Sequence, residues 1–103
     1  MGGVYFIASY DVTDAERYER EYVPGVVASL AAAGGTVVAT GSAEMLEGTT
    51  AGHTVVFRFA SVEAFRNWYD GPDYTSLRSL RSATTTNNTA VLARQFGAAH
   101  DDR

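Results

Sequence analysis

Two residues near the middle of the 103-residue chain, His53 and Arg58, have the side-chain types that proton transfer and oxyanion binding require. A histidine near its ordinary pKa exchanges protons at neutral pH. A guanidinium holds a carboxylate or an enolate oxygen through a planar fork of N–H donors. Both residues are therefore predicted to be catalytic. Two structural alternatives stay open: His53 as a solvent-exposed loop residue at a strand start, and Arg58 in an interface salt bridge to Glu44 or Glu47, across the sheet or the dimer.

A group of aromatic residues with polar tips, together with one arginine, is predicted to bind a planar ligand. The predicted ligand-binding residues are Tyr10, Trp68, Tyr69, Tyr74 and Arg81. Each has a structural alternative. The aromatic side chains also suit a core in which their polar atoms are hydrogen-bonded, and Arg81 suits the end of a helix, where a cation complements the helix dipole.

Several other kinds of chemistry lack the residues that they need. The chain has no cysteine, which excludes disulfides, thiol catalysis and thiolate metal sites. His53 and His100 are the two histidines, and no histidine and carboxylate have the spacing of metal ligands on a helix, so no metal is predicted. Gly34-Gly35 closes a helix and does not open one, so no dinucleotide or phosphate loop is present and no cofactor is predicted.

The charge pattern excludes further classes of partner. The formal net charge is −4, and the eight cationic side chains are all arginines that form no cluster. Nucleic acids are bound by clustered Lys and Arg, so they are not a predicted partner. No apolar run reaches the roughly 18 residues of a membrane span, and the first residues lack the pattern of a signal peptide. The expectation is a cytoplasmic protein without membrane contact.

Hydrophobic periodicity gives the elements that must position these residues. The predicted strands cover residues 4–12, 36–40 with a possible continuation through 43–46, 54–60 and 84–96. One helix is predicted to follow a capping box from Thr13 to Glu16 and to end at Gly34-Gly35. A second is predicted to begin at the N-cap Ser61 and to end with a left-handed Gly71 before Pro72, and a third covers residues 73–81.

Two details of these elements can also be predicted. Pro24 lies inside the first helix, and because proline has no amide hydrogen, the helix is predicted to kink or split near Tyr22. In the third strand, alternation places Phe57 and Phe59 on one face and Arg58 on the opposite face. His53 then lies on the face opposite to Arg58, unless a bulge changes the register.

The order of elements, β-α-β-β-α-β, predicts an α+β, ferredoxin-like domain with one antiparallel sheet. Residues 1–96 are predicted to form this domain, and residues 97–103, which show no periodicity, a flexible tail. Both faces of the first strand are largely apolar, whereas the helices can cover only one face of the sheet. A second sheet is therefore predicted to cover the other face, which makes a homodimeric α/β barrel.

Short motifs in a consistent order also match a known family. They are Tyr5-Phe6-Ile7-Ala8, Val12-Thr13-Asp14 with Tyr18, Pro24, Gly34-Gly35, Leu46-Glu47-Gly48, Phe59-Ala60-Ser61 with Glu63-Ala64, Trp68-Tyr69, Asp73-Tyr74 and Arg81. Over residues 4–96 the chain resembles the DUF1330 family of the dimeric α/β-barrel superfamily. The resemblance implies a homodimer with a cavity beside the sheet, and it implies no single reaction. Related superfamily members include cofactor-free monooxygenases, polyketide cyclases, muconolactone isomerase-like proteins and haem-degrading enzymes.

Two positions depart from the family pattern and bear on the ligand. The residue before Phe59 is often glutamate in such proteins and is Arg58 here. His53 stands where the third strand usually begins with arginine. An arginine in place of glutamate favours an anionic or carbonyl-bearing ligand.

These observations lead to two hypotheses on function. The first is a small cofactor-independent enzyme of isomerase, cyclase or monooxygenase type that acts on an acidic, aromatic or polyketide-like small molecule. The alternative is a non-catalytic dimeric protein that binds a small ligand. An enzyme is expected to have His53 or a buried carboxylate within hydrogen-bond reach of the cavity. A binding protein is expected to have a cavity that contains no titratable group.

Overall fold

The structure is a computed structural model that describes residues 2–49 and 52–97. Its elements are β1 (Val4–Val12), α1 (Ala15–Arg17), the π-helical segment η1 (Tyr18–Tyr22), α2 (Val23–Ala33), β2 (Thr36–Ser42), β3 (His53–Phe59), α3 (Val62–Tyr69), α4 (Pro72–Thr84) and β4 (Thr85–Arg94). This order confirms the predicted β-α-β-β-α-β arrangement. Residues 98–103 of the predicted tail, with His100 among them, lie outside the described residues.

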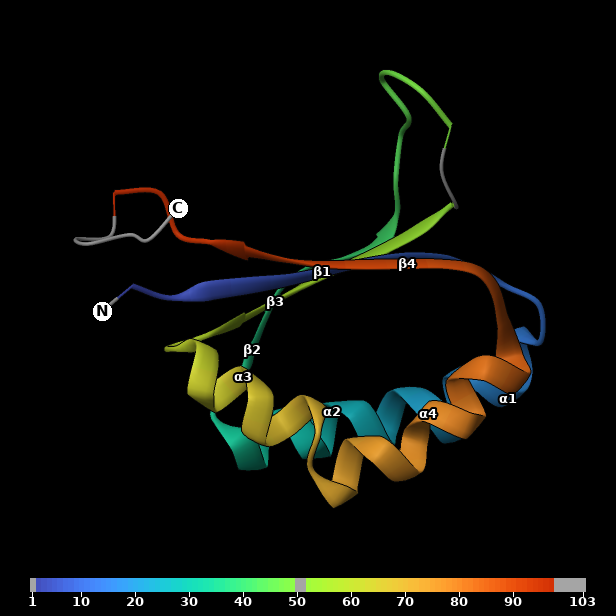
Figure 1. Cartoon of the computed structure of the whole chain (residues 1–103). Coiled ribbons are helices and arrows are strands. Elements are labelled where there is room, and N and C mark those ends of the chain that lie inside the picture. Colours follow the sequence, from blue (N-terminus) through green and yellow to red (C-terminus); the bar gives the residue numbers. More distant parts are fainter. Residues whose placement is uncertain (1, 50–51, 98–103) are drawn as a thin grey trace.

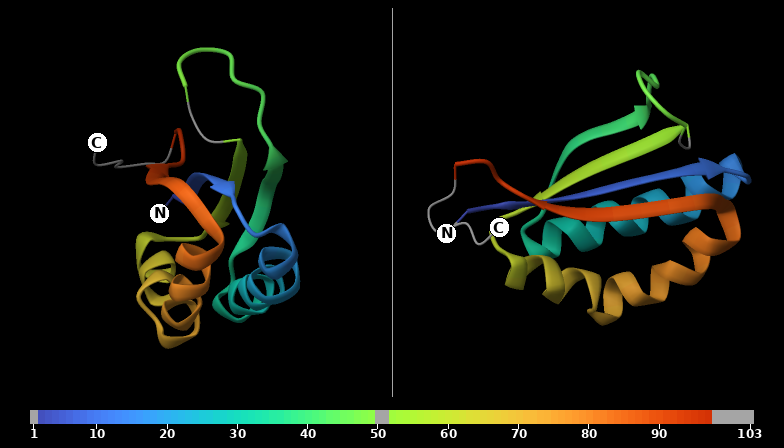
Figure 2. Two further views of the ribbon diagram at one scale, coloured as in Figure 1. Left: turned by 90° about the vertical axis from the view of Figure 1, so that its right-hand side faces the viewer. Right: turned by 45° about the horizontal axis from the view of Figure 1, so that its top comes forward.

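Four antiparallel strands form one sheet in the order β2-β3-β1-β4. The helices form a layer on one face of this sheet (Figure 1). Figure 2 shows that residues 43–49, which follow β2, project on the side of the sheet away from the helices. The architecture is the predicted α+β, ferredoxin-like fold, and the described residues leave one face of the sheet uncovered.

The core lies between the sheet and the helices. Strand alternation directs Phe6, Phe57 and Phe59 toward the helical layer, where they are 3%, 7% and 0% exposed. Phe65 and Trp68 of α3 pack onto them, with 5.7 Å between the ring centroids of Phe6 and Trp68. Buried aromatic side chains of this size dominate core energetics. They fix α3 against the centre of the sheet.

The first helical stretch is not one continuous α-helix. The segment η1 ends at Tyr22, and α2 begins at Val23. Pro24 lies in the first turn of α2, a position at which the missing amide hydrogen of proline is tolerated. The amide of Val23 reaches back to the carbonyl of Tyr18, which is the hydrogen bond of a π-helix. The helical hydrogen-bond pattern thus changes near Tyr22, but Tyr22 and Val23 keep right-handed helical backbone angles, so the helix does not split there. The π-helical form of η1 stacks Tyr18 on Tyr22, with ring centroids 5.3 Å apart.

The junction between α3 and α4 follows the prediction at one end and departs from it at the other. Ser61 is the N-cap of α3, and its hydroxyl accepts the amide of Ala64 at 3.0 Å. Gly71 was expected to be left-handed, but it is extended with φ −77° and caps the start of α4. A Cβ atom at this position would collide with the backbone oxygen of Asn67. Glycine is required here by close approach and not by backbone twist.

Two further boundaries correct the predictions. The N-cap of α1 is Asp14 and not Thr13, because the Asp14 carboxylate accepts the amide of Arg17 at 3.2 Å. Strand β2 ends at Ser42, and residues 43–46 are not a strand. Beyond Ser42 the chain leaves the sheet, so β-propensity there finds no partner strand.

The end of α4 and the start of β4 also differ from the predicted boundaries. The helix continues to Thr84, whose hydroxyl donates to the carbonyl of Leu80 at 2.9 Å. In β4, Asn87 has a positive φ of 57°, and the register with β1 shifts between Ser9 and Asp11. The amide of Asn87 donates to the Asp11 carboxylate at 2.9 Å, which holds this bulge in place.

Candidate functional site

A cavity of about 100 Å³ lies between the sheet and the stretch formed by η1 and α2. It is lined by Phe6, Tyr10, Tyr18, Tyr22, Val23, Val26, Val27, Leu30, Val37, Thr40, Val55, Phe57 and Arg81. Val27 and Val37 are 53% and 48% exposed, so the cavity reaches the surface between α2 and β2. A cavity of about 150 Å³ holds benzene. The volume here therefore suits the reacting end of a ligand, with the rest at the apolar rim.

Three polar groups form a chain at one end of the cavity. The pairing of β1 with β3 sets Tyr10 opposite His53, and η1 brings Tyr18 between them. The hydroxyls of Tyr10 and Tyr18 are 2.6 Å apart, and the Tyr18 hydroxyl lies 3.4 Å from Nε2 of His53. Tyr18 lines the cavity. The imidazole is thus within reach of the cavity through the hydroxyl of Tyr18.

A second hydrogen-bonded group surrounds Arg81, which α4 brings to the same cavity. The Arg81 Nη1 donates to the Tyr74 hydroxyl at 3.1 Å, and that hydroxyl is 3.0 Å from the hydroxyl of Tyr22. The Arg81 Nε donates to Oδ1 of Asn88 at 3.0 Å. The guanidinium carbon lies 4.8 Å from the centre of the Tyr10 ring. Arg81 therefore contacts both hydrogen-bonded tyrosine pairs: the pair of Tyr74 with Tyr22 through a hydrogen bond, and the pair of Tyr10 with Tyr18 through the Tyr10 ring.

The charge of Arg81 has no carboxylate partner within the described part of the chain. No carboxylate oxygen of the described residues lies within 4.0 Å of its guanidinium nitrogens, and the ion pairs that form involve other arginines. Burial lowers the pKa of Arg81, but the neighbouring tyrosines, Tyr74 first, more than offset this and leave that pKa raised. The guanidinium stays charged. A partly buried cation whose partners are neutral oxygens favours an anionic ligand.

Burial favours the neutral forms of Tyr10, Tyr18, Tyr22 and His53. Burial raises the pKa of Tyr10, Tyr18 and Tyr22 above the ordinary value, because it disfavours the phenolate. Burial lowers the pKa of His53, because it disfavours the imidazolium. The hydroxyls can therefore donate to an oxyanion, and the imidazole can accept a proton.

Arg58 lies outside this site. It points to the face of the sheet away from the helices, and the β1–β3 register pairs it with Tyr5, at the other end of β3 from the histidine. Its Nη2 donates to Oε1 of Gln95 at 3.1 Å. Within the described chain neither the Glu44 nor the Glu47 carboxylate lies within 4.0 Å of it, so the ion pair does not form across the sheet, and an ion pair across the dimer stays a prediction. Arg58 and His53 cannot act on one ligand in one protomer.

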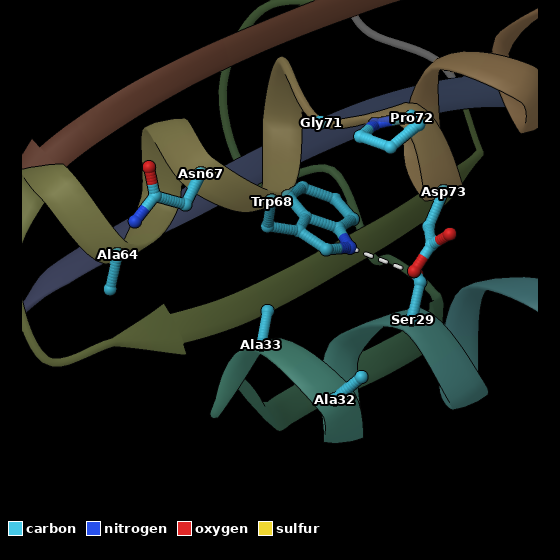
Figure 3. A pocket seen from close by; sticks show the side chains of 9 residues that line it. All are labelled: Ser29, Ala32, Ala33, Ala64, Asn67, Trp68, Gly71, Pro72 and Asp73. Atoms are coloured by element: carbon cyan, nitrogen blue, oxygen red, sulfur yellow. Dashed lines mark hydrogen bonds between the residues drawn. The ribbon is translucent and has the colours of Figure 1, made fainter.

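Trp68 and Tyr69 lie in the core and not in the cavity wall. Trp68 is 3% exposed, and its Nε1 donates to the hydroxyl of Ser29 at 2.9 Å. Figure 3 shows Trp68 at the floor of a separate hollow of about 420 Å³ on the helical layer, between α2 and the junction of α3 and α4. Tyr69 stacks on Phe65, with ring centroids 5.2 Å apart. Their structural alternative accounts for both residues.

The site thus contains part of the predicted set and two further residues. Of the predicted residues, those brought together are His53, Tyr10, Tyr74 and Arg81. Tyr18 and Tyr22 join them and were not selected from the sequence. Their signal is a pair of tyrosines four residues apart on an apolar helical face, shortly before a proline. π-Helical segments are frequent at functional sites, which strengthens that signal.

Residues 2–49 and 52–97 contain no group of three or more His, Asp or Glu side chains placed to hold a metal ion. Among the helices of the same residues, none is both long enough and apolar enough to cross a membrane.

Comparison with known families identifies one match. The model of a domain of unknown function, DUF1330, matches residues 3–95 of the chain. A comparison with curated proteins found no match. The family match covers every element of the fold and assigns no reaction.

Solved structures share the fold at low sequence identity. A protein of unknown function from Rhodopseudomonas palustris is 20% identical, with a TM-score of 0.78 over 94% of this chain and 85% of that chain. A dimeric ferredoxin-like protein of unknown function from Bacteroides fragilis is 14% identical, with a TM-score of 0.63 over 92% and 98%. SnoaB, a cofactor-independent oxygenase from Streptomyces nogalater, is 12% identical, with a TM-score of 0.63 over 98% and 100%. These similarities show the fold.

Proposed function

The chain belongs to the DUF1330 family, and from that premise we propose that it is a small cofactor-independent enzyme of isomerase, cyclase or monooxygenase type. Its substrate is an acidic, aromatic or polyketide-like small molecule. The three reaction types share one early step, the removal of a proton from a carbon next to a carbonyl or phenolic group. That step leaves an enolate, whose oxygen needs stabilisation.

One observation carries the proposal: the cation of Arg81, which has no carboxylate partner among the described residues, donates to the Tyr74 hydroxyl, lies over the Tyr10 ring and lines the same cavity as Tyr22. Donors fixed in a protein site stabilise developing negative charge more than water does, because they need no reorganisation. The Arg81 guanidinium and the Tyr22 hydroxyl are therefore assigned to bind the enolate or carboxylate oxygen of the ligand, while the Tyr10 hydroxyl donates to the Tyr18 oxygen.

The same geometry offers a path for the proton. The carbon-bound proton passes to the Tyr18 oxygen while the Tyr18 hydroxyl proton passes to Nε2 of His53. An isomerisation returns the proton along this path to a different carbon. The distance of 3.4 Å between the Tyr18 hydroxyl and Nε2 is long for a hydrogen bond, so the transfer needs the two groups to approach each other. Tyr18 and His53 are thus assigned to proton transfer.

The similarity to known structures agrees with this class of function without deciding it. SnoaB is a cofactor-independent oxygenase, but at 12% identity it shows the fold alone. The other matches described above have no known function. The assignment of a reaction type to this chain therefore rests on its own cavity.

Hydrogen exchange on a panel of carbon acids tests the proposal. The panel spans an aliphatic keto acid, an arylpyruvate and a cyclic diketone, and deuterium uptake at the acidic carbon is followed by proton NMR in heavy water. The protein is expected to accelerate uptake for at least one member. Tyr18→Phe and Arg81→Gln are each expected to reduce that acceleration by about 10²-fold, the usual contribution of acid–base or oxyanion groups. Arg58→Gln, outside the cavity, is the matched control and should change it by less than about twofold.

A specific observation also supports the non-catalytic alternative. His53 lies behind Tyr18, and the described lining of the cavity contains no carboxylate, so the direct contact between a base and the ligand is absent. If panel members bind, with chemical-shift changes at Val26 and Leu30, but exchange at the rate measured in buffer, the enzyme proposal is discarded. The ligand-binding protein is then the better description.

We propose a homodimer as the working form. The face of β1 that carries Tyr5 and Ile7 is covered by no described element, and Val91 of β4, paired with Ile7, is 59% exposed. An apolar sheet face of this kind marks an interaction surface. The B. fragilis protein, which shares the fold, is described as dimeric.

A further inference from the structure

A second hollow of about 250 Å³ adjoins Arg81 between α4 and the edge strand β4. We call it the outer hollow. It is lined by Tyr69, Tyr74, Arg78, Arg81, Ser82, Asn88, Thr89 and Ala90. The tyrosine-lined cavity is mostly apolar apart from its hydroxyls, whereas the outer hollow has two guanidiniums. Arg81 lines both spaces and separates them.

Arg78 is held at the outer hollow but is incompletely hydrogen-bonded. Its guanidinium carbon lies 4.0 Å from the centre of the Tyr69 ring, and its Nη2 donates to the Tyr69 carbonyl at 2.8 Å. Its Nε is buried and has no hydrogen-bond partner among the described residues. A donor removed from water without an acceptor is costly. An acceptor supplied by a ligand would relieve that cost after a small rotation of the side chain.

The donors of Arg81 are also only partly used. A guanidinium has five N–H groups. The hydrogen bonds within the described chain go from Nε to Asn88 and from Nη1 to Tyr74. Both acceptors belong to residues that line the outer hollow. The remaining donors of this guanidinium are available to a ligand on either side.

The charge balance at the outer hollow is positive. The carboxylate that pairs with Arg78 is Asp70, whose Oδ1 lies 3.7 Å from the Arg78 Nη2 and whose Oδ2 lies 3.9 Å from Arg66 Nη1. This pair is longer than a hydrogen bond, and the Asp70 side chain is 59% exposed, so it neutralises Arg78 weakly. Arg81 has no such partner in the described chain. Two cations therefore face one hollow with one loosely held carboxylate.

We propose that the outer hollow is a second binding site, which takes the carboxylate or phosphate group of a small anionic molecule between Arg78 and Arg81. Guanidinium groups bind these oxyanions through short, charge-assisted hydrogen bonds, and bidentate pairing adds orientation. The partly buried ring of Tyr69 lies beside Arg78, and the buried Tyr74 hydroxyl accepts from Arg81. The site goes beyond the proposed catalytic cavity, and it can exist whether or not that cavity turns a substrate over.

Amide NMR titrations of the full chain with sodium acetate and with inorganic phosphate, at constant ionic strength, test the site. Binding is expected to shift the amides of Ser82 and Asn88, and the stronger of the two anions identifies the favoured group. Arg78→Gln is expected to weaken binding about tenfold or more, since it removes one charge-assisted contact. Arg78→Lys, which keeps the charge and loses the fork, should give a smaller loss. Arg66→Gln is the matched control and should stay within about twofold.

A further variant keeps the test independent of the stacking between Arg78 and Tyr69. Asn88→Asp places a carboxylate on the acceptor that already receives the Arg81 Nε, so the hydrogen bond is kept while the positive charge is neutralised. Binding is expected to weaken about tenfold. Unchanged binding in both Arg78→Gln and Asn88→Asp would overturn the proposal. Anion-induced shifts confined to Val26 and Leu30 would also overturn it, because they would place the anion in the tyrosine-lined cavity. That result would leave the proposed catalytic function untouched.

Discussion

At the residue scale, the site depends on an imidazole that is neutral while still within reach of a hydroxyl. Burial lowers the pKa of His53 below its ordinary value of 6.5. Between the lowered pKa and 6.5, the unfolded chain binds more protons at this residue than the folded chain. The free energy of unfolding is therefore expected to fall as the pH decreases through this window. A proton NMR titration of the imidazole, in a His100→Gln background that leaves one histidine, should give a midpoint below 6.5.

The control for this prediction is His53→Gln. Urea unfolding above and below the window should show a smaller loss of stability in this variant than in the unsubstituted chain, because the titrating group is gone. A midpoint at or above 6.5 would contradict the assignment of a neutral His53, and with it the proton path through Tyr18.

A second prediction at this scale concerns Trp68, whose indole is buried. Ser29→Ala removes the acceptor of the Trp68 Nε1 and leaves that donor buried without a partner. We expect a loss of about 1–3 kcal/mol in the free energy of unfolding. Ser42→Ala, at an exposed position at the end of β2, is the control and should change it by less than about 0.5 kcal/mol. Equal stability of the two variants in urea titrations would show that the hydrogen bond contributes little.

The sequence predicted the residue types of the candidate site better than it predicted which of these residues lie together in the structure. Alternation in β3 correctly separated Arg58 from His53. It did not reveal that Arg81 would reach Tyr10 from α4, because that contact joins segments far apart in the chain. Tyr18 was overlooked for a related reason: its position toward the cavity depends on the π-helical register of η1. The positions of Arg81 and Tyr18 are set by packing between distant segments, which sequence periodicity does not indicate.

At the element scale, local signals predicted the elements and several of their ends. Pro24 and Ser61 marked a change in the helical hydrogen-bond pattern and an N-cap because their effects act within one turn. The end of β2 was missed, because a strand ends where its partner ends. The prediction of a left-handed Gly71 was wrong, because glycine is needed there to avoid a clash with the Asn67 carbonyl and not to adopt a positive φ. Signals that depend on a distant or newly approached segment were the ones that failed.

That account of Gly71 makes a prediction. Gly71→Ala adds a Cβ that collides with the backbone oxygen of Asn67, so the junction of α3 and α4 must shift. We expect a loss of about 1–3 kcal/mol in the free energy of unfolding, the usual cost of overpacking. Gly52→Ala is the matched control, since its Cβ would lie 3.7 Å from its nearest neighbour, an ordinary contact. If thermal and urea unfolding rank the two variants equally, the close approach at Gly71 is not a constraint.

At the scale of the whole molecule, one sheet has one covered face and one open face. The helices lie on the covered side (Figure 2). Residues of these helices line both the tyrosine-lined cavity and the outer hollow. The open face carries no group of the proposed catalytic site. Covering it by a second copy would therefore stabilise the sheet behind the site without blocking the cavity mouth between α2 and β2. Assembly and chemistry are thus assigned to opposite faces of one sheet.

This separation predicts a variant that loses the dimer and keeps its fold. Ile7 lies on the open face beside Val56 and Val91 in the strand register, and its side chain is not needed in the core between sheet and helices. Ile7→Glu places a charge on that apolar face, and burying it against a second sheet would leave it unpaired. Sedimentation velocity at micromolar concentration is expected to show a dimer for the unsubstituted chain and a monomer for Ile7→Glu, with circular dichroism unchanged. Ala28→Glu, at an exposed position on α2, should remain dimeric. A monomeric unsubstituted chain, or a dimeric Ile7→Glu variant, would show that the open face is not the interface.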